Sequence, residues 1–117
     1  MNELVAEHVL RLVERIPAGR VVSYGDIGHI VGVGPRQVGA VMSRYGGGVT
    51  WWRVTNASGV LPEPILDEAR AHWFDEGTPV QTGGRGCRIS EARADLRALE
   101  TEYRAAVADL EQDGELR

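Results

Sequence analysis

The feature that most constrains this 117-residue chain is a pair of short helical segments separated by the glycine turn Gly32-Val33-Gly34. Ser23 precedes the first segment as a predicted N-cap, and Asp26 falls in its first turn, where a carboxylate suits the positive end of the helix dipole. Pro35 suits the first position of the second segment, whose apolar residues recur at helical spacing as far as Arg44. Two short helices joined by a glycine turn are typical of a helix-turn-helix.

The segments around this pair predict a small, mostly α-helical fold. We expect an amphipathic helix over residues 3–15, a β-hairpin over residues 49–61 that forms a wing, and a second amphipathic helix over residues 65–76. Five residues of this second helix are predicted to face inward: Ile65, Leu66, Ala69, Trp73 and Phe74. We therefore predict a winged helix-turn-helix domain over residues 1–80, followed by a C-terminal loop and helical extension over residues 81–117.

The extension is predicted to contain one final helix, which begins at Ser90 as its capping residue. Its apolar residues alternate three and four apart, in a seam made of Leu96, Leu99, Tyr103, Ala106 and Leu110. A helix of this length is marginal in water unless another surface covers its seam. We expect it to pack back on the helix at 3–15, because so short a seam is poorly suited to a coiled coil between chains. We therefore expect a monomer.

Charge is unevenly distributed along the chain. The net charge of −4 argues against a strongly basic nucleic-acid binder, but residues 16–62 carry four arginines and one aspartate. Residues 63–117 carry thirteen acids and seven arginines. This asymmetry points to an anionic partner for the basic half. All thirteen basic residues are arginine, whose planar guanidinium suits both phosphate contact and stacking.

Composition also excludes several kinds of site and location. Because Cys87 is the single cysteine, the chain makes no internal disulfide and no cysteine-based zinc site, and its three scattered histidines make no metal cluster. We therefore expect neither a metal nor a cofactor. No stretch is long and apolar enough to span a membrane, and the N-terminus lacks the basic region of a signal peptide. These features predict a cytoplasmic protein with no membrane partner.

Residues suited to catalysis are few. Cys87 is the obvious candidate nucleophile, since it lies between Arg85 and Arg88, whose charges would lower its pKa if the fold brings them close. No histidine lies near it in the sequence, so a loop cysteine without a catalytic role is the alternative. The glycine run at 46–48 lacks a lysine and follows a helix, so it predicts the end of that helix and not a phosphate loop.

A series of short motifs spans residues 16–62: Ile16-Pro17, Gly19, Ser23-Tyr24-Gly25, Arg36-Gln37-Val38-Gly39 and Arg53-Val54. In their order and approximate spacing they are similar to the DNA-binding domain of the O6-alkylguanine-DNA alkyltransferases. The family pattern runs from isoleucine-proline-x-glycine through (Ser/Thr)-Tyr-Gly and Arg-x-Val-Gly to Pro-Cys-His-Arg-Val. The resemblance implies a winged helix-turn-helix whose second helix docks in the minor groove of DNA.

One departure from the family pattern changes the implied function. The reactive cysteine of the family should stand at Trp51, and its histidine at Trp52. Indole has no lone pair that accepts an alkyl group, so the resemblance implies no alkyl transfer and no enzyme. The substitution resembles that of the alkyltransferase-like proteins, which bind O6-alkylguanine in double-stranded DNA and pass the lesion to nucleotide excision repair proteins.

The resemblance also implies roles for individual residues. A lesion at guanine O6 is hidden in a duplex, so the base must rotate out of the stack. Arg36 is expected to fill the vacated position, and a solvated arginine at a helix end is the alternative. Tyr24 is expected to press on the backbone phosphate, and a half-buried core tyrosine is the alternative. Further DNA-binding residues are expected at the two helix N-termini and along the second helix: Ser23, Pro35, Gln37, Gly39 and Ala40.

The lesion pocket is expected to contain Tyr24, Trp51, Val60 and Leu61. Because strand neighbours point to opposite faces, Trp51 would contact the base and its alkyl group, and Trp52 would face the core or a second layer. Arg53 is predicted to pair internally, not to contact DNA. Two other functions stay open at this point: a winged-helix transcription regulator, and an active alkyltransferase that uses Cys87.

Overall fold

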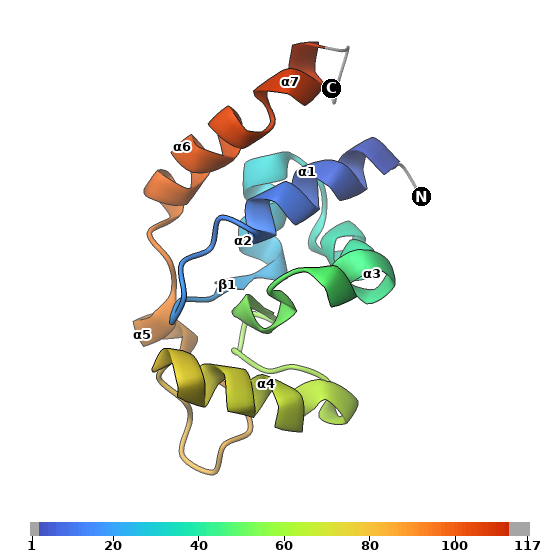
Figure 1. Cartoon of the computed structure of the whole chain (residues 1–117). Helices are drawn as coiled ribbons and strands as arrows, with labels where there is room; N and C mark the ends of the chain where they lie inside the picture. The colour runs from blue at the N-terminus through green and yellow to red at the C-terminus, as the bar shows by residue number, and fades with distance from the viewer. Residues whose placement is uncertain (1–2, 113–117) are drawn as a thin grey trace.

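The computed structural model describes residues 3–112. In chain order the elements are α1 (Glu3–Val13), β1 (Val22–Ser23), α2 (Tyr24–Val31), α3 (Pro35–Tyr45), the short 3-10 helices η1 (Gly46–Gly48) and η2 (Trp51–Arg53), β2 (Val54–Thr55), α4 (Glu63–Glu76), α5 (Ile89–Ala92), α6 (Leu96–Ala106) and α7 (Ala108–Gln112). Helices α1, α2, α3 and α6 lie on one side of β1, and α4 lies on the other (Figure 1). No helix in the described part of the chain combines the length and apolarity needed to cross a bilayer.

The predicted helix-turn-helix is present as α2 and α3. Ser23 is the N-cap of α2: its Oγ accepts a hydrogen bond from the Asp26 amide at 3.0 Å, and the Asp26 carboxylate accepts one from the Ser23 amide at 2.9 Å. Gly32 ends α2 with φ 95°, a conformation that favours glycine. A Cβ at Gly28 would lie 2.5 Å from the Val33 carbonyl oxygen, so glycine there lets the turn pass close to α2.

Two hydrophobic clusters hold the fold together. The larger joins α1, α2 and α3 to α6, and its buried residues include Val9, Leu12, Ile27, Val38 and Tyr103. The smaller lies around α4 and α5, and its buried residues include Leu66, Ala69, Trp73, Cys87 and Ala92. Both clusters therefore contain residues from beyond position 80.

The prediction of a mostly helical chain with a small sheet is confirmed, but the strands of that sheet are not the predicted hairpin. β1 pairs in parallel with β2, with Val22 opposite Val54. The turn at 56–59 forms, since the Asn56 amide donates to the Val60 carbonyl at 3.1 Å, yet Val60 then bridges Gly86. The hairpin prediction was wrong because the partner of β2 lies about thirty residues earlier in the chain, where local sequence patterns do not reveal it.

α4 buries a narrower face than predicted. Leu66, Ala69 and Trp73 are buried as expected, whereas Ile65 is 36% exposed and Phe74 is 85% exposed. Phe74 follows Trp73 directly, and one residue turns a helix by about 100°, which carries its ring to the solvent side. The prediction that Ile65 and Phe74 face inward was therefore wrong. Ile65 instead faces the pocket described below.

The predicted final helix is divided into three helices, and Ser90 lies within α5 instead of capping a long helix. The chain next to α5 is extended because it pairs with the backbone of Val21, whose amide donates to Ala92 and whose carbonyl accepts from Ala94, each at 3.0 Å. Asp95 is the residue whose side chain caps α6. Non-local backbone pairing therefore interrupts a segment whose side-chain pattern alone is helical.

α6 packs back against α1, as the sequence analysis predicts. Leu99, Tyr103 and Val107 are buried in the larger cluster. Arg11 of α1 donates to the Ala106 carbonyl at 2.9 Å and pairs with Asp109 at 2.7 Å. Figure 1 shows α6 running alongside α1, away from α4.

Candidate nucleic-acid interface

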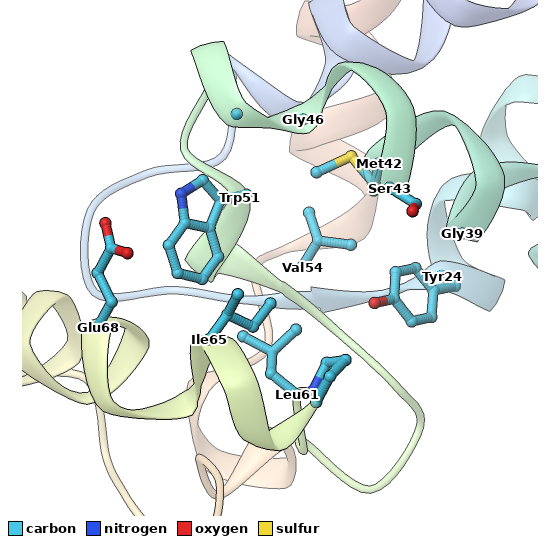
Figure 2. Close-up of a pocket in the computed structure, with 12 residues that line it drawn as sticks. Tyr24, Gly39, Met42, Ser43, Gly46, Trp51, Val54, Leu61, Ile65 and Glu68 are labelled. Atoms are coloured by element: carbon cyan, nitrogen blue, oxygen red, sulfur yellow. The ribbon is translucent and has the colours of Figure 1, made fainter.

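A pocket of about 590 Å³ opens between the helix-turn-helix and α4. Tyr24 lies at one side of it near α3, and Trp51 lies at the other side with Ile65 and Glu68 of α4 (Figure 2). The lining residues are Tyr24, Gly39, Met42, Ser43, Gly46, Gly47, Trp51, Val54, Leu61, Pro62, Ile65 and Glu68. Most of them present apolar side chains or glycine backbone, so the walls suit a flat, largely apolar group.

The exposed face of α3 borders this pocket. Pro35 is the first residue of the helix, and the Gln37 Oε1 accepts a hydrogen bond from the Gly34 amide at 3.3 Å. Arg36, Gln37 and Ala40 are exposed. No described residue forms an ion pair or hydrogen bond with the Arg36 guanidinium. α3 thus presents an unpaired cation beside the pocket.

Gly39 and Tyr24 form the edge of the pocket nearest α3. A Cβ built at Gly39 would meet no atom within 4 Å, so the space beside this glycine is open. Tyr24 is the first residue of α2 and is half-buried, and this burial raises the pKa of its phenol. The hydroxyl therefore stays protonated at neutral pH and can donate a hydrogen bond to a phosphate or a base.

Trp51 lies on the 3-10 helix η2 and not on the expected strand. The Arg53 amide donates to the Thr50 carbonyl at 3.0 Å, which closes this turn, and the Thr50 hydroxyl donates to the Val13 carbonyl at 3.3 Å, which holds it against α1. The Trp51 ring lines the pocket and meets the Trp52 ring edge-on, with centroids 5.7 Å apart. The two indoles therefore point in different directions on a tight helical turn.

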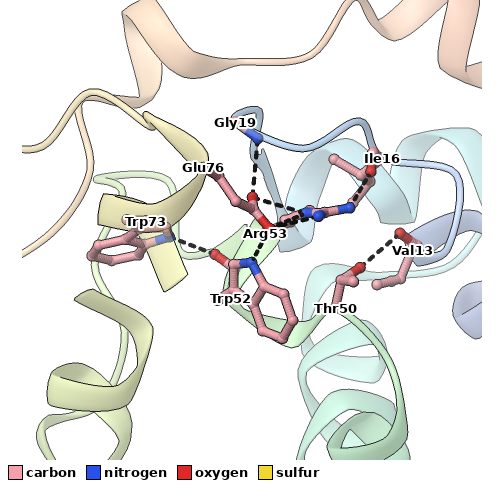
Figure 3. Close-up of polar contacts among 8 residues, drawn as sticks. All are labelled: Val13, Ile16, Gly19, Thr50, Trp52, Arg53, Trp73 and Glu76. Atoms are coloured by element: carbon pink, nitrogen blue, oxygen red, sulfur yellow. Dashed lines mark hydrogen bonds and ion pairs between the residues drawn. The ribbon is translucent and has the colours of Figure 1, made fainter. Parts of the chain in front are cut away.

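Trp52 joins η2 to α4 through contacts with three residues of that helix. Its ring stacks on His72 of α4, with centroids 3.5 Å apart and planes within 5°. Its Nε1 donates to the Glu76 carboxylate at 2.9 Å, and its carbonyl accepts from the Trp73 Nε1 at 2.7 Å (Figure 3). Trp52 is thus a structural residue whose contacts fix the position of the preceding indole.

Arg53 pairs internally, as predicted. Its guanidinium lies 2.6 Å from the Glu76 carboxylate and donates to the Ile16 carbonyl at 2.8 Å, while the Gly19 amide donates to the same carboxylate at 3.0 Å (Figure 3). Burial alone would raise the pKa of Glu76, but the hydrogen bonds from Arg53, Gly19 and Trp52 outweigh it, so the pKa is lowered. An ionised Glu76 therefore ties together three segments of the chain.

Three of the four residues expected to form the pocket are brought together in the structure: Tyr24, Trp51 and Leu61. Val60 is not among the lining residues. Sequence reasoning missed several lining side chains: Met42, Ser43, Val54, Ile65 and Glu68. The first two lie one helical turn after Gly39, so helical spacing was a usable signal for them. The two on α4 depend on where that helix packs, and no local pattern shows it.

Cys87 is fully buried in the smaller cluster and does not line the pocket. Burial raises the pKa of its thiol to about 11, so the thiol is protonated at neutral pH and is a poor nucleophile. Arg85 and Arg88 are exposed and do not produce the lowered pKa that their places in the sequence suggested. Among the described residues, no group of histidine, cysteine and carboxylate side chains is arranged to hold a metal ion.

Residues 5–76 match the family model described as 6-O-methylguanine DNA methyltransferase, DNA binding domain. The proteins named "DNA base-flipping protein" from Escherichia coli K12 and Shigella flexneri are each 36% identical to this chain over 85 residues. These matches cover 68% of this chain and 66% of each relative.

A solved structure is similar over a larger part of the chain. It is that of S. pombe Atl1 in complex with damaged DNA containing O6-carboxymethylguanine, with a TM-score of 0.68 and 25% identity. The similarity covers 81% of this chain and 98% of the Atl1 chain. On the strength of the motifs, the fold and these matches, the chain belongs to the family of the 6-O-methylguanine DNA methyltransferase DNA-binding domain, in its alkyltransferase-like branch.

Proposed function

We propose that this protein binds O6-alkylguanine in duplex DNA and holds the rotated base in its pocket, without any chemical step. One observation carries the proposal: the pocket opens directly beside the exposed face of α3. A base that leaves a duplex docked along α3 therefore meets an apolar cavity with an aromatic wall. Its volume of about 590 Å³ lies in the range of small-molecule sites. The names of the relatives, a base-flipping protein and a complex with damaged DNA, support the same reading.

The individual roles follow from position. Arg36 enters the duplex from the minor groove and fills the place of the rotated base, because it is exposed and unpaired at the start of α3. Tyr24 presses on the phosphate of that nucleotide, and Trp51 contacts the base and its alkyl group. The remaining contacts to the DNA backbone come from Pro35, Gln37, Gly39 and Ala40. Ser23, also expected to bind DNA, is buried with its hydroxyl and amide bonded to Asp26, so its part is to hold the start of α2. All of these residues fall within residues 1–80, the proposed DNA-binding domain.

The proposal includes that the protein transfers no alkyl group. Trp51 stands where the resemblance places the reactive cysteine, and an indole ring does not accept an alkyl group. Cys87 is buried away from the pocket with its thiol protonated, which disfavours the alternative of a working alkyltransferase. We propose that the bound complex marks the lesion for nucleotide excision repair proteins, in line with the resemblance. Since α6 covers its seam on α1 of the same chain, the protein is proposed to act as a monomer.

A titration tests the binding. One duplex with and without a single O6-methylguanine is titrated at fixed salt, because phosphate contacts make affinity depend on the salt concentration. The lesion duplex is expected to bind more tightly, while equal binding of the two would overturn the proposal. In a parallel gel competition, preference for one undamaged sequence over lesion DNA would favour the transcription regulator.

A second measurement tests the absence of chemistry. The protein is incubated with the lesion duplex, and the DNA and the Cys87 peptide are analysed by mass spectrometry. The O6-methylguanine is expected to stay intact and Cys87 to stay unmodified. Stoichiometric appearance of S-methylcysteine would show an active alkyltransferase.

A further inference from the structure

The two ends of the pocket differ in chemistry. The end beside α3 is formed by Tyr24 and Gly39, whereas the far end is formed by Trp51 with Ile65 and Glu68 of α4 (Figure 2). If the proposed function holds, the base enters past α3, so the substituent on its O6 extends toward the far end. The residues around Trp51 then decide which substituents are accepted.

Glu68 is the one charged residue that lines this pocket. Its carboxylate reaches from α4 toward the end of the pocket occupied by Trp51 (Figure 2). Neither an arginine nor a histidine is among the lining residues. In the described part of the chain, Arg70 is paired with Asp67 and donates to the Gly84 carbonyl, and no ion pair joins it or any other cation to Glu68.

We propose that Glu68 makes the pocket select O6 substituents without negative charge and reject anionic ones such as carboxymethyl. This inference rests on the proposed function. Transfer of a neutral alkyl group from water to the apolar walls around Val54, Leu61 and Ile65 lowers the free energy of binding. A carboxylate in the same place loses water and gains no cationic partner, and it meets a second negative charge that costs free energy at short range. Atl1 was solved in complex with damaged DNA containing O6-carboxymethylguanine, a lesion that the pocket of the present protein is proposed to bind weakly.

The test compares duplexes that differ at one guanine: unmodified, O6-methyl, O6-carboxymethyl and O6-carbamoylmethyl. Carbamoylmethyl has nearly the size and shape of carboxymethyl but carries no charge, so the ratio of their dissociation constants isolates the charge. With wild-type protein at pH 8, carbamoylmethylguanine is expected to bind about tenfold more tightly than carboxymethylguanine. In Glu68→Gln, which keeps the side-chain shape, the ratio is expected to fall to about twofold or less.

Asp67→Asn is the matched control. It removes one negative charge from the neighbouring position of α4, and that carboxylate is 93% exposed and does not line the pocket. The ratio is expected to stay at the wild-type value in this variant. An equal fall in Asp67→Asn and Glu68→Gln would show a general charge effect and overturn the assignment to Glu68.

The outcomes separate this inference from the proposed function. If O6-methylguanine binds better than guanine but the carboxymethyl and carbamoylmethyl duplexes bind alike, the charge selection is wrong and the lesion binding stands. If all four duplexes bind wild-type protein alike, both proposals fail. Circular dichroism of each variant shows that a changed ratio does not come from unfolding.

Discussion

At the scale of single residues, Arg36 is the sharpest test of how the base leaves the stack. Rotating a base out of a duplex costs a few kcal/mol, and a planar guanidinium that occupies the gap offsets part of that cost. Arg36→Ala is therefore expected to weaken lesion binding by about 2 kcal/mol, measured by titration with O6-methylguanine DNA. Arg36→Lys keeps the positive charge but lacks the planar guanidinium, so its affinity for lesion DNA should be little higher than that of Arg36→Ala.

Arg44→Ala is the control for charge alone, since Arg44 is also exposed on α3. We expect a smaller loss from it, and a similar one for damaged and undamaged DNA. If Arg36→Ala loses no more affinity than Arg44→Ala, Arg36 contacts only the backbone and does not fill the stack.

Gly39 allows stability and binding to be separated within one substitution. The added methyl of Gly39→Ala meets no protein atom within 4 Å, and alanine is favoured over glycine inside a helix by about 0.5–1 kcal/mol. The free energy of unfolding should therefore rise by about that amount in urea titrations. The same methyl projects from α3 at the edge of the pocket, so lesion affinity is expected to fall. A variant that is more stable and binds lesion DNA as well as wild type would show that neither DNA nor base approaches this position.

At the scale of elements, Glu76 links the turn at η2 to the end of α4 and to the segment around Gly19. Its side chain and that of Arg53 are 13% and 15% exposed, so removing the charge leaves a largely buried guanidinium poorly paired. Glu76→Gln is expected to lower the free energy of unfolding by about 2–3 kcal/mol at pH 7. Glu100→Gln, which breaks the exposed pair with Arg104, should cost well under about 1 kcal/mol.

The pH dependence of that loss follows from the direction of the pKa shift. The pKa of Glu76 in the folded protein lies below its usual value of 4.5, so its stabilisation is complete above that value and disappears as pH falls through the folded pKa. The difference in unfolding free energy between wild type and Glu76→Gln should therefore shrink when urea titrations are repeated at successively lower pH below 4.5. A difference that stays constant across this range would mean that the carboxylate charge is not its source.

The elements also show what the sequence could and could not predict. α1, α2, α3 and α4 were predicted because their signals are local: helical spacing, the Ser23 cap and the glycine turn. The parallel pairing of Val22 with Val54 and the stacking of Trp52 on His72 join residues that are distant in sequence. Each depends on packing of whole elements, so local patterning could not show it. For the same reason only part of the pocket was predicted. The family motif identifies Trp51, whereas the lining residues Ile65 and Glu68 depend on where α4 packs.

At the scale of the whole molecule, the C-terminal tail belongs to the folded body. Ala92 and Cys87 are buried in the smaller cluster, and Leu99, Tyr103 and Val107 are buried in the larger. The tail is also rich in acids, which would repel phosphates if it lay against DNA. Helices α6 and α7 lie along α1, away from α4 (Figure 1), and no described residue beyond position 80 lines the pocket. The acidic helices α6 and α7 therefore support the fold on a side that the proposed DNA does not occupy.

This arrangement predicts a weak dependence of DNA binding on salt. α3 carries only two arginines, Arg36 and Arg44, and both are exposed. The logarithm of the binding constant falls with the logarithm of salt concentration by about 0.9 for each phosphate neutralised, so two contacts give a slope of about −2. Titrations of lesion DNA between about 50 and 200 mM salt measure the slope, and Arg44→Ala should bring it to about −1. A slope near −6 would require cations that this face of α3 does not hold, and would place the DNA on another surface.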